Sequence, residues 1–338
     1  MTHEFRNLIT IAHLWQKQGH KVVMATVVAR EGSSYRRPGV RMLVNESGEM
    51  MGAVSGGCVE KEVLRQSQSV FKEGKPKMMA YDGRYRLGCE GVLYVLLEPI
   101  AISEVIYGQL QPYFQERIPF ACHSYFFKQE GEAEGMGSVL VLKGKKHPLY
   151  DAFSEKTATN TEIFSQEFSP IFQLYIFGAE HDAVELCKMG HLLGWDVYVV
   201  ATPDEEKTIH YFEGATALWT PHFDALDVSR IDAQTAVVLM SHSFHKDVQY
   251  LMALRDVQPA YFGLLGPKHR RERLFSEFLD RYPDTPFNFF EQLKGPAGID
   301  IGAESASEIA VSIVAEILST IRKTLPQSLQ HKTGNIHD

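Results

Sequence analysis

The sequence predicts an α/β protein in which a mixed α/β domain is followed by a Rossmann-like domain with a doubly wound parallel sheet. Two observations carry this prediction. The 338 residues suffice for two hydrophobic cores, and 44% of them are hydrophobic. In the C-terminal half, short apolar runs alternate with helical stretches, which is typical of parallel strands joined by crossover helices.

The first domain is expected over residues 1–143. An amphipathic helix over residues 4–18 precedes the apolar, β-branched run Val22–Ala29, which indicates a buried strand. The further elements expected are a hairpin of Arg41–Asn45 and Glu49–Val54, a helix over Cys58–Lys72, strands near Lys77–Tyr81 and at Val92–Leu97, a helix around Ser103–Gln115, and strands near Phe120–Lys128 and Ser138–Leu142.

Residues 144–170 are polar and weakly periodic, so we expect a linker there. The Rossmann-like domain is expected over residues 171–325, with a polar tail over 326–338. Its last helix begins after Ser305, where a capping-box pattern stands. Its strands are expected to start at Gln173 and run into the turn at Gly178, and then to follow at Asp196–Val200, Ala215–Trp219, Ala236–Met240 and Tyr261–Leu265.

Composition excludes several classes of protein. The net charge is −8 without any block of Lys and Arg, so a broad surface for nucleic acid or anionic membrane is not expected. No apolar run approaches a membrane span, and Met1–Arg6 lacks the apolar core of a signal peptide. The four cysteines have no C-x-x-C spacing, which argues against a disulfide framework or a zinc finger. We therefore expect a cytoplasmic protein with reduced thiols.

The turn Ser55-Gly56-Gly57-Cys58 is the first candidate site. The two glycines permit a tight turn and a close approach of a ligand to the backbone. The helix expected from Cys58 would point its free N–H groups at that turn, which favours an anion. The same field favours the thiolate of Cys58, the form that binds soft metals and sulfur species.

Two further segments could complete this site. The loop over residues 32–39 is basic, and arginine forks match phosphate oxygens; its candidate ligands are Ser33, Ser34, Arg36, Arg37 and, just beyond it, Arg41. Cys89 lies in a second glycine-flanked turn before a strand. Two thiols beside a basic loop suit a ligand with phosphate and sulfur or metal groups. Alternatively, Cys58 and Cys89 are small buried hydrophobes, as we expect of Cys122 and Cys187.

A second candidate site lies at the carboxyl edge of the parallel sheet. With the strand order 3-2-1-4-5, the loops after the first and fourth strands open a crevice. Candidate ligands for a metal or an acid–base site there are His181, His242, His245 and Asp247; Gly178, His181, His242 and Asp247 are also candidates for binding a cofactor. Alternatively, these are solvated loop residues. An NAD(P) site at the same turn is not favoured, because Glu180 replaces the second glycine of G-x-G-x-x-G and Ala201 stands where an acid should bind the ribose.

Several motifs, in this order, resemble the xanthine dehydrogenase accessory family of XdhC/CoxI type. The resemblance covers about residues 20–100 and 172–320. In the first domain the motifs are Gly32–Gly39, Ser55–Glu60 and Gly88–Gly91 ahead of the strand that ends at Glu98-Pro99; in the second they are Phe177–Ala179, Ser241-His242 with Asp247, Gly263–Pro267 and Ile309–Ile313. Tyr35, Glu90, Glu180 and Ala201 depart from the family pattern.

The resemblance implies a protein that binds the molybdenum cofactor (molybdopterin), supports its sulfuration and delivers it to a xanthine dehydrogenase-type molybdenum hydroxylase. Cys58 is then the first candidate for contact with molybdenum or sulfur, and Cys89 the second. We expect a cofactor chaperone, a homodimer, with a cysteine desulfurase as a further partner. The chain lacks an iron–sulfur cysteine pattern and the length of the multidomain dehydrogenase. The alternatives are an NAD(P)-dependent oxidoreductase and a metal-dependent enzyme that use the C-terminal crevice.

Overall fold

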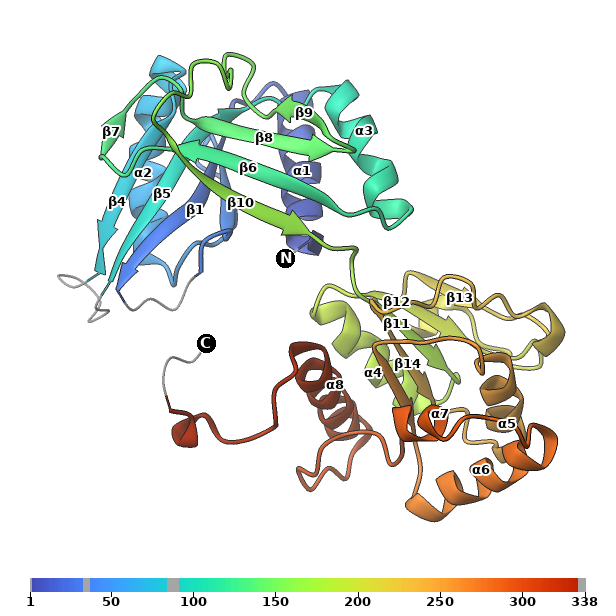
Figure 1. The fold of residues 1–338 in the computed structure, drawn as a ribbon. Helices are drawn as coiled ribbons and strands as arrows, with labels where there is room; N and C mark the ends of the chain where they lie inside the picture. The colour runs from blue at the N-terminus through green and yellow to red at the C-terminus, as the bar shows by residue number, and fades with distance from the viewer. Residues whose placement is uncertain (1, 33–36, 84–90, 334–338) are drawn as a thin grey trace. The chain divides into compact units, whose positions relative to one another are not determined.

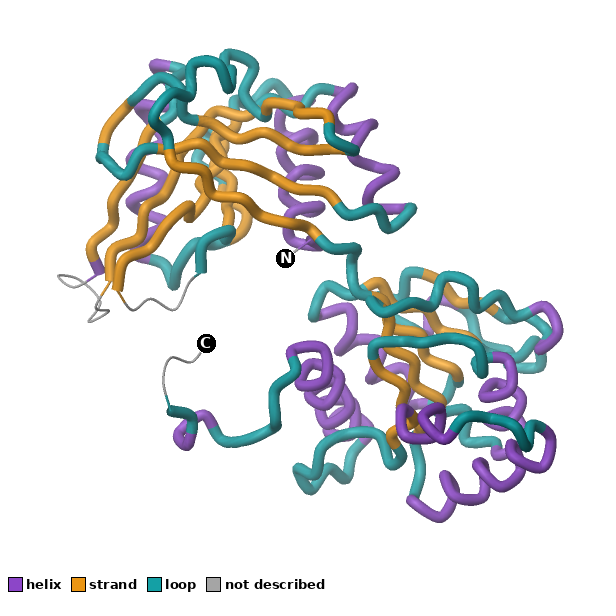
Figure 2. Tube along the Cα trace, in the orientation of Figure 1, coloured by secondary structure: helices purple, strands orange, loops and turns teal. Residues whose placement is uncertain are grey.

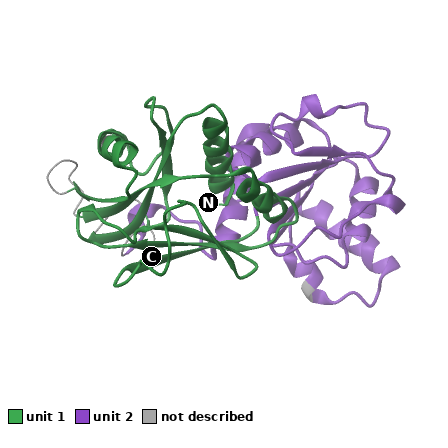
Figure 3. Cartoon of the chain, turned by 90° about the horizontal axis from the view of Figure 1, so that it is seen from above, with its two compact units in different colours: residues 1–170 green, residues 171–338 purple. Residues whose placement is uncertain are grey.

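The computed structural model describes residues 2–32, 37–83 and 91–333, apart from the side chains of Cys58 and Asn288 (Figure 1). The chain forms two compact units, residues 1–170 and residues 171–338 (Figure 3). Each unit contains its own sheets and its own hydrophobic core.

The N-terminal unit is built on two antiparallel sheets. The first has six strands in the order β3-β2-β1-β5-β4-β7 and the second has four in the order β10-β6-β8-β9. Their bounds are β1 (Val22–Gly32), β2 (Arg41–Asn45), β3 (Met50–Gly52), β4 (Lys77–Asp82), β5 (Gly91–Ile100), β6 (Phe120–Phe126), β7 (Gly131–Glu132), β8 (Gly137–Leu142), β9 (Lys145–Pro148) and β10 (Glu162–Phe168).

Three helices cover these sheets: α1 (Thr2–Lys17), α2 (Cys58–Glu73) and α3 (Glu104–Gln115) (Figure 2). Successive residues of the central strands belong to different cores, as the alternation of side chains in a strand requires. Val23 packs in the core that α2 closes, whereas Met24 packs in the core that α1 and α3 share with the second sheet. The central strands of the first sheet are therefore buried on both faces, whereas its edge strand β3 is exposed.

The structure differs from the sequence prediction over residues 144–170, where a linker was expected. This segment carries β9 and β10, and β10 pairs with β6 along its whole length. Only Gln166 and Phe168 of β10 are buried, so its local sequence has little hydrophobic signal. The pairing with a strand about forty residues earlier, not local periodicity, makes this segment a strand.

The C-terminal unit contains a six-stranded parallel sheet in the order β13-β12-β11-β14-β15-β16. This confirms the doubly wound prediction and adds a short sixth strand to it. The bounds are β11 (Gln173–Phe177), β12 (Asp196–Val200), β13 (Ala217–Trp219), β14 (Thr235–Leu239), β15 (Tyr261–Leu264) and β16 (Leu293–Lys294).

Helices cover both faces of this sheet. On one face α4 (His181–Leu192) and α8 (Ala306–Arg322) pack against each other and the sheet; on the other lie α5 (Phe244–Ala253), α6 (Lys268–Arg281) and α7 (Phe287–Gln292). The C-terminal unit also contains the 3-10 turns η2 (Ile209–Tyr211), η3 (Phe223–Ala225) and η4 (Leu329–His331), the last within the expected polar tail. Over the described ranges, no helix combines the length and apolarity needed to cross a membrane.

Candidate functional site

The glycine turn before α2 has the predicted position, because α2 begins at Cys58. Its N-cap residue Gly57 has φ 121°, a conformation that favours glycine. A Cβ built on Gly56 or on Gly57 would meet nothing within 4 Å. The protein therefore leaves open space beside both glycines, as a ligand-binding turn requires.

Glu60 changes the electrostatics expected of this turn. Its buried carboxylate accepts hydrogen bonds from the backbone N–H of Ser55 at 2.5 Å and of Gly57 at 2.6 Å. The N–H groups of these two turn residues therefore donate to the protein itself, and a carboxylate lies beside the turn where an anion was expected. The sequence analysis missed this role, although the spacing of Gly57 and Glu60 matches the N-cap and N3 positions of a capping box.

Most of the other predicted ligands of this site lie outside the described residues. These are Ser33, Ser34, Arg36, Cys89 and the side chain of Cys58. Arg37, at the end of the basic loop, is described and exposed. Contact of the two thiols with a ligand stays a prediction.

Arg41 occupies a different environment from the one predicted. It is 6% exposed, and its guanidinium lies beside the adjacent rings of Phe5 and Phe168, at 5.4 and 5.6 Å from their centroids. Its Nη1 donates to the carbonyl of Gly39 at 3.0 Å and to Oε1 of Gln166. Arg41 therefore anchors the end of the basic loop to β10 rather than extending from that loop into solvent.

A buried polar cluster lies next to Arg41. The carboxylate of Glu98 accepts hydrogen bonds from N–H and Oγ of Ser138, at 2.7 and 2.5 Å. Burial raises the pKa of Glu98 to about 7, although these hydrogen bonds and the charge of Arg41 act in the opposite direction. Burial also raises the pKa of Cys122 to about 11, so its thiol is protonated at neutral pH, as expected of a core residue.

In the C-terminal unit, the loops after β11 and β14 meet as the strand order predicts. Gly178 has φ 142°, and a Cβ there would lie 2.4 Å from the carbonyl oxygen of Met240. Glycine is therefore required at position 178, because the two loops lie too close together for a side chain. Across the same junction, Nε2 of His242 lies 2.8 Å from Oδ2 of Asp182 in the first turn of α4.

The predicted metal ligands are not assembled into one site. Asp247 is 1% exposed and accepts hydrogen bonds from Oγ of Ser241 at 2.5 Å and Nη2 of Arg270 at 2.6 Å. His245 is exposed at the start of α5, and His181 opens α4. Among the residues that the structure describes, no group of three or more His, Cys, Asp or Glu side chains could hold a metal ion. Asp247 therefore acts in packing, as the partner of a partly buried arginine.

Lys207 is a residue of this region that the sequence analysis missed. Its Nζ donates to the carbonyl of Ala179 at 2.5 Å and lies 3.2 Å from Oε2 of Glu180. The lysine thus binds the turn where a dinucleotide would bring its pyrophosphate. No motif could have identified Lys207, because it lies in the irregular chain after β12, 27 residues from Glu180.

Comparison with known families decides the relationship. A model described as the XdhC Rossmann domain matches residues 174–317, and a model of the XdhC and CoxI family matches residues 15–82. The chain belongs to the XdhC and CoxI family. The matched ranges of this XdhC-type chain contain the basic loop, the turn before α2 and the junction of β11 with β14, so the predicted resemblance is confirmed.

Full-length relatives agree with this assignment. The XdhC-type chain is 28% identical to a Bacillus subtilis protein described as a probable subunit of xanthine dehydrogenase, over 94% of this chain and 98% of that protein. It is 24% identical to the molybdenum cofactor insertion chaperone PaoD of Escherichia coli, over 94% of this chain and 89% of PaoD. A crystal structure described as a xanthine dehydrogenase from Bacillus halodurans is similar, with a TM-score of 0.75, 26% identity, and coverage of 96% of this chain and 97% of that one.

Proposed function

We propose that this chain binds the molybdenum cofactor and delivers it to a xanthine dehydrogenase-type molybdenum hydroxylase, as a cofactor chaperone. One observation carries the proposal: the chain matches its family in both units, and a relative aligned over 94% of it is described as a molybdenum cofactor insertion chaperone. The cofactor is cargo in this function, and the chain itself performs no turnover.

The chemistry of the N-terminal unit supports such a cargo. The cofactor carries a phosphate and a molybdenum–dithiolene centre. The exposed Arg37 and the start of the sixteen-residue helix α2 suit the phosphate, and open space adjoins Gly56 and Gly57. Cys58, the first residue of α2, would contact molybdenum or its sulfur ligand, with Cys89 as the second thiol. Sulfuration with a cysteine desulfurase as sulfur donor, and assembly as a homodimer, belong to the same proposal.

The two enzymatic alternatives have less support. For a nicotinamide cofactor, Lys207 and Glu180 would have to leave the turn after β11, where they bind each other. For a metal-dependent enzyme, the described residues offer no set of ligands in the crevice. A titration that shows no binding of any of the four nicotinamide cofactors would exclude the oxidoreductase. Elemental analysis that finds no bound transition metal would exclude the metal-dependent enzyme.

Anaerobic titration of the purified protein with molybdenum cofactor tests the proposal. The wild type is compared with Cys58→Ser and with a matched control, Cys187→Ala, which removes a buried thiol of α4 in the other unit. We expect binding by the wild type and the control, and a loss of affinity of about tenfold or more in Cys58→Ser. If Cys58→Ser binds as the wild type does, the thiol has no part in binding. If the wild type itself does not bind, the chaperone function is wrong.

A further inference from the structure

The strand β3 forms an open edge of the first sheet of the N-terminal unit. It is the outermost strand of the order β3-β2-β1-β5-β4-β7, and within the described ranges no strand pairs with its outer side. All three of its residues are exposed, and Met50 and Met51 are 46% and 36% accessible. Such an edge offers unpaired backbone N–H and C=O groups to another strand.

The hydrogen bonds of the hairpin show which groups of β3 face outward. The N–H of Asn45 donates to the carbonyl of Glu49 at 3.0 Å, so the backbone of Glu49 faces β2. Because backbone groups alternate between the two sides of a strand, Met51, two residues further on, also bonds to β2. The N–H and C=O groups of Met50 and Gly52 therefore point away from the sheet.

The edges of the second sheet are protected in ways that β3 is not. β9 exposes Lys145 and Lys146 and ends at Pro148, and β10 exposes Glu162 and Glu167. Charged side chains and proline on an edge strand oppose pairing with another chain. The strand β3 consists of two methionines and a glycine, which carry no charge against an approaching strand.

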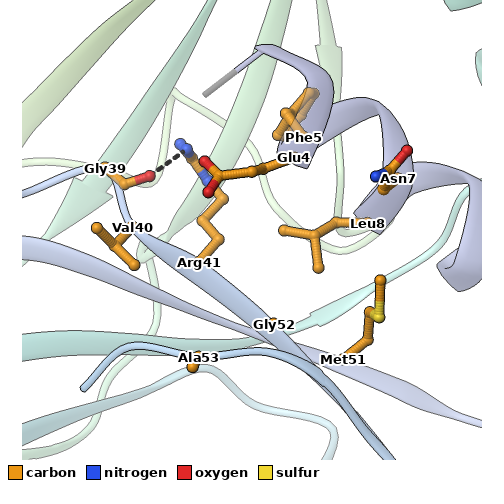
Figure 4. A pocket seen from close by; sticks show the side chains of 10 residues that line it. All are labelled: Glu4, Phe5, Asn7, Leu8, Gly39, Val40, Arg41, Met51, Gly52 and Ala53. Carbon is orange, nitrogen blue, oxygen red and sulfur yellow. Dashed lines mark hydrogen bonds between the residues drawn. The ribbon is translucent and has the colours of Figure 1, made fainter. Parts of the chain in front are cut away.

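This edge is complementary to a second copy of itself. If two β3 strands run antiparallel with Met51 at the twofold axis, Met50 of each copy lies opposite the partner's Gly52. These are the residues whose N–H and C=O groups point outward, so each such pair can form both of its hydrogen bonds. The two Met51 side chains then meet on the face of the sheet that α1 covers, where Met51 lines a pocket together with Leu8 (Figure 4).

The charges at the two ends of the hairpin favour the same antiparallel arrangement. At its turn, the exposed acids Glu46 and Glu49, with Lys21 beside them, give a net negative charge. At the other end, where β2 begins, the exposed Arg37 belongs to the basic loop. Antiparallel pairing brings the acidic end of each copy toward the basic end of its partner, whereas parallel pairing would bring like ends together.

We propose that two copies of this chain assemble through β3, so that the first sheets of their N-terminal units join into one continuous sheet. The proposal rests on the homodimer of the proposed function and adds its interface. In this register Glu49 of one copy lies opposite the partner's Ala53, two residues before the turn that starts at Ser55. The hairpin of each copy thus lies beside the turn at which its partner is proposed to bind the cofactor.

Disulfide cross-linking of the full chain tests the register. The two copies of residue 51 would form a non-hydrogen-bonded pair with Cα atoms about 4.5 Å apart, a distance that a disulfide can bridge. Met51→Cys should therefore give a covalent dimer under mild oxidation. One control is Met50→Cys, whose copies would be diagonal neighbours roughly 7–8 Å apart. Ile163→Cys, at an exposed position of the edge strand β10, is the other; both controls should cross-link no more than the wild type.

Charge substitution at the same position tests the twofold axis. Met51→Lys and Met51→Glu each place like charges face to face, so each should be a monomer by light scattering at concentrations where the wild type is a dimer. An equal mixture of the two variants should recover the dimer, because opposite charges then meet. Ile163→Lys and Ile163→Glu are the matched controls and should stay dimeric.

The outcomes separate the interface from the rest of the proposed function. A dimer that persists in both charge variants, without cross-linking of Met51→Cys, overturns this interface and leaves the homodimer. Monomeric charge variants that stay monomeric when mixed overturn the twofold axis, and a monomeric wild type overturns the homodimer as well. Titration of the wild type with molybdenum cofactor is read independently: a cross-linked, charge-sensitive dimer that binds no cofactor leaves the interface in place and overturns the chaperone function.

Discussion

The carboxylate of Glu60 accepts a hydrogen bond of 2.6 Å from the backbone N–H of Gly57, three residues earlier at the start of α2. This contact gives the N–H of the N-cap residue an acceptor, whereas glycine has no side chain to cap the N–H groups of the first helical turn. The turn proposed to hold the cofactor is thus held in shape by an internal anion.

Glu60→Ala should lower the stability of α2 by about 1–2 kcal/mol, because two backbone N–H groups lose their acceptor. Hydrogen exchange of α2 peptides, followed by mass spectrometry, measures this locally. Glu60→Gln should recover part of the loss. Glu73→Ala, at the exposed other end of α2, is the control and should leave exchange nearly unchanged. Equal exchange in Glu60→Ala and the wild type would contradict the capping role.

Glu98 should make the N-terminal unit less stable as the pH rises. Its pKa is raised from an ordinary 4.5 to about 7 in the folded protein, so between these values the folded state binds more protons than the unfolded state. The contribution of Glu98 to the free energy of unfolding is complete below pH 4.5. It falls by up to about 3 kcal/mol as the pH rises through 7.

The measurement is exchange of β5 peptides at matched intrinsic rates between pH 5 and pH 8. Glu98→Gln keeps an acceptor for Ser138 and removes the titration, so it should flatten the decline. A variant that declines as steeply as the wild type would mean that another group causes the effect.

Asp247→Asn should destabilise the C-terminal unit by about 3 kcal/mol or more, because it leaves the partly buried Arg270 without its anionic partner. Thermal unfolding of single and double variants with Arg270→Met gives the coupling energy between the two residues. The double variant should be more stable than Asp247→Asn alone. Additive losses would show that the pair does not act together.

Gly178→Ala should cost about 2–3 kcal/mol, since the new Cβ would have to displace the carbonyl of Met240 at a strained φ. Gly302→Ala separates the two causes, because Gly302 has φ 71° but nothing within 4 Å of a Cβ. It should therefore cost only about 1 kcal/mol. Similar losses at both positions, measured by denaturant unfolding, would mean that the loop contact is unimportant.

The parallel sheet could be predicted from the sequence because its main strands are short, mostly apolar and separated by helical periods. Leu174, Ile176 and Val199, for example, are all completely buried. β10 could not be predicted in this way, since Gln166 and Glu167 gain their place only by pairing with Cys122 and Ala121. The burial of Arg41 was missed for the same reason: its partners Phe168 and Gln166 are distant in sequence.

The hydrogen bond from Arg41 to Gln166 also has a consequence for biosynthesis. The two residues are 125 positions apart, and β10 is the last strand of the N-terminal unit. During translation the hairpin of β2 and β3 leaves the ribosome long before β10 does, and domains fold largely as units in this order. Until β10 has emerged and paired with β6, Arg41 lacks Gln166 and the ring of Phe168. The surroundings of Arg41, at the end of the basic loop, are therefore the last part of the unit to be completed.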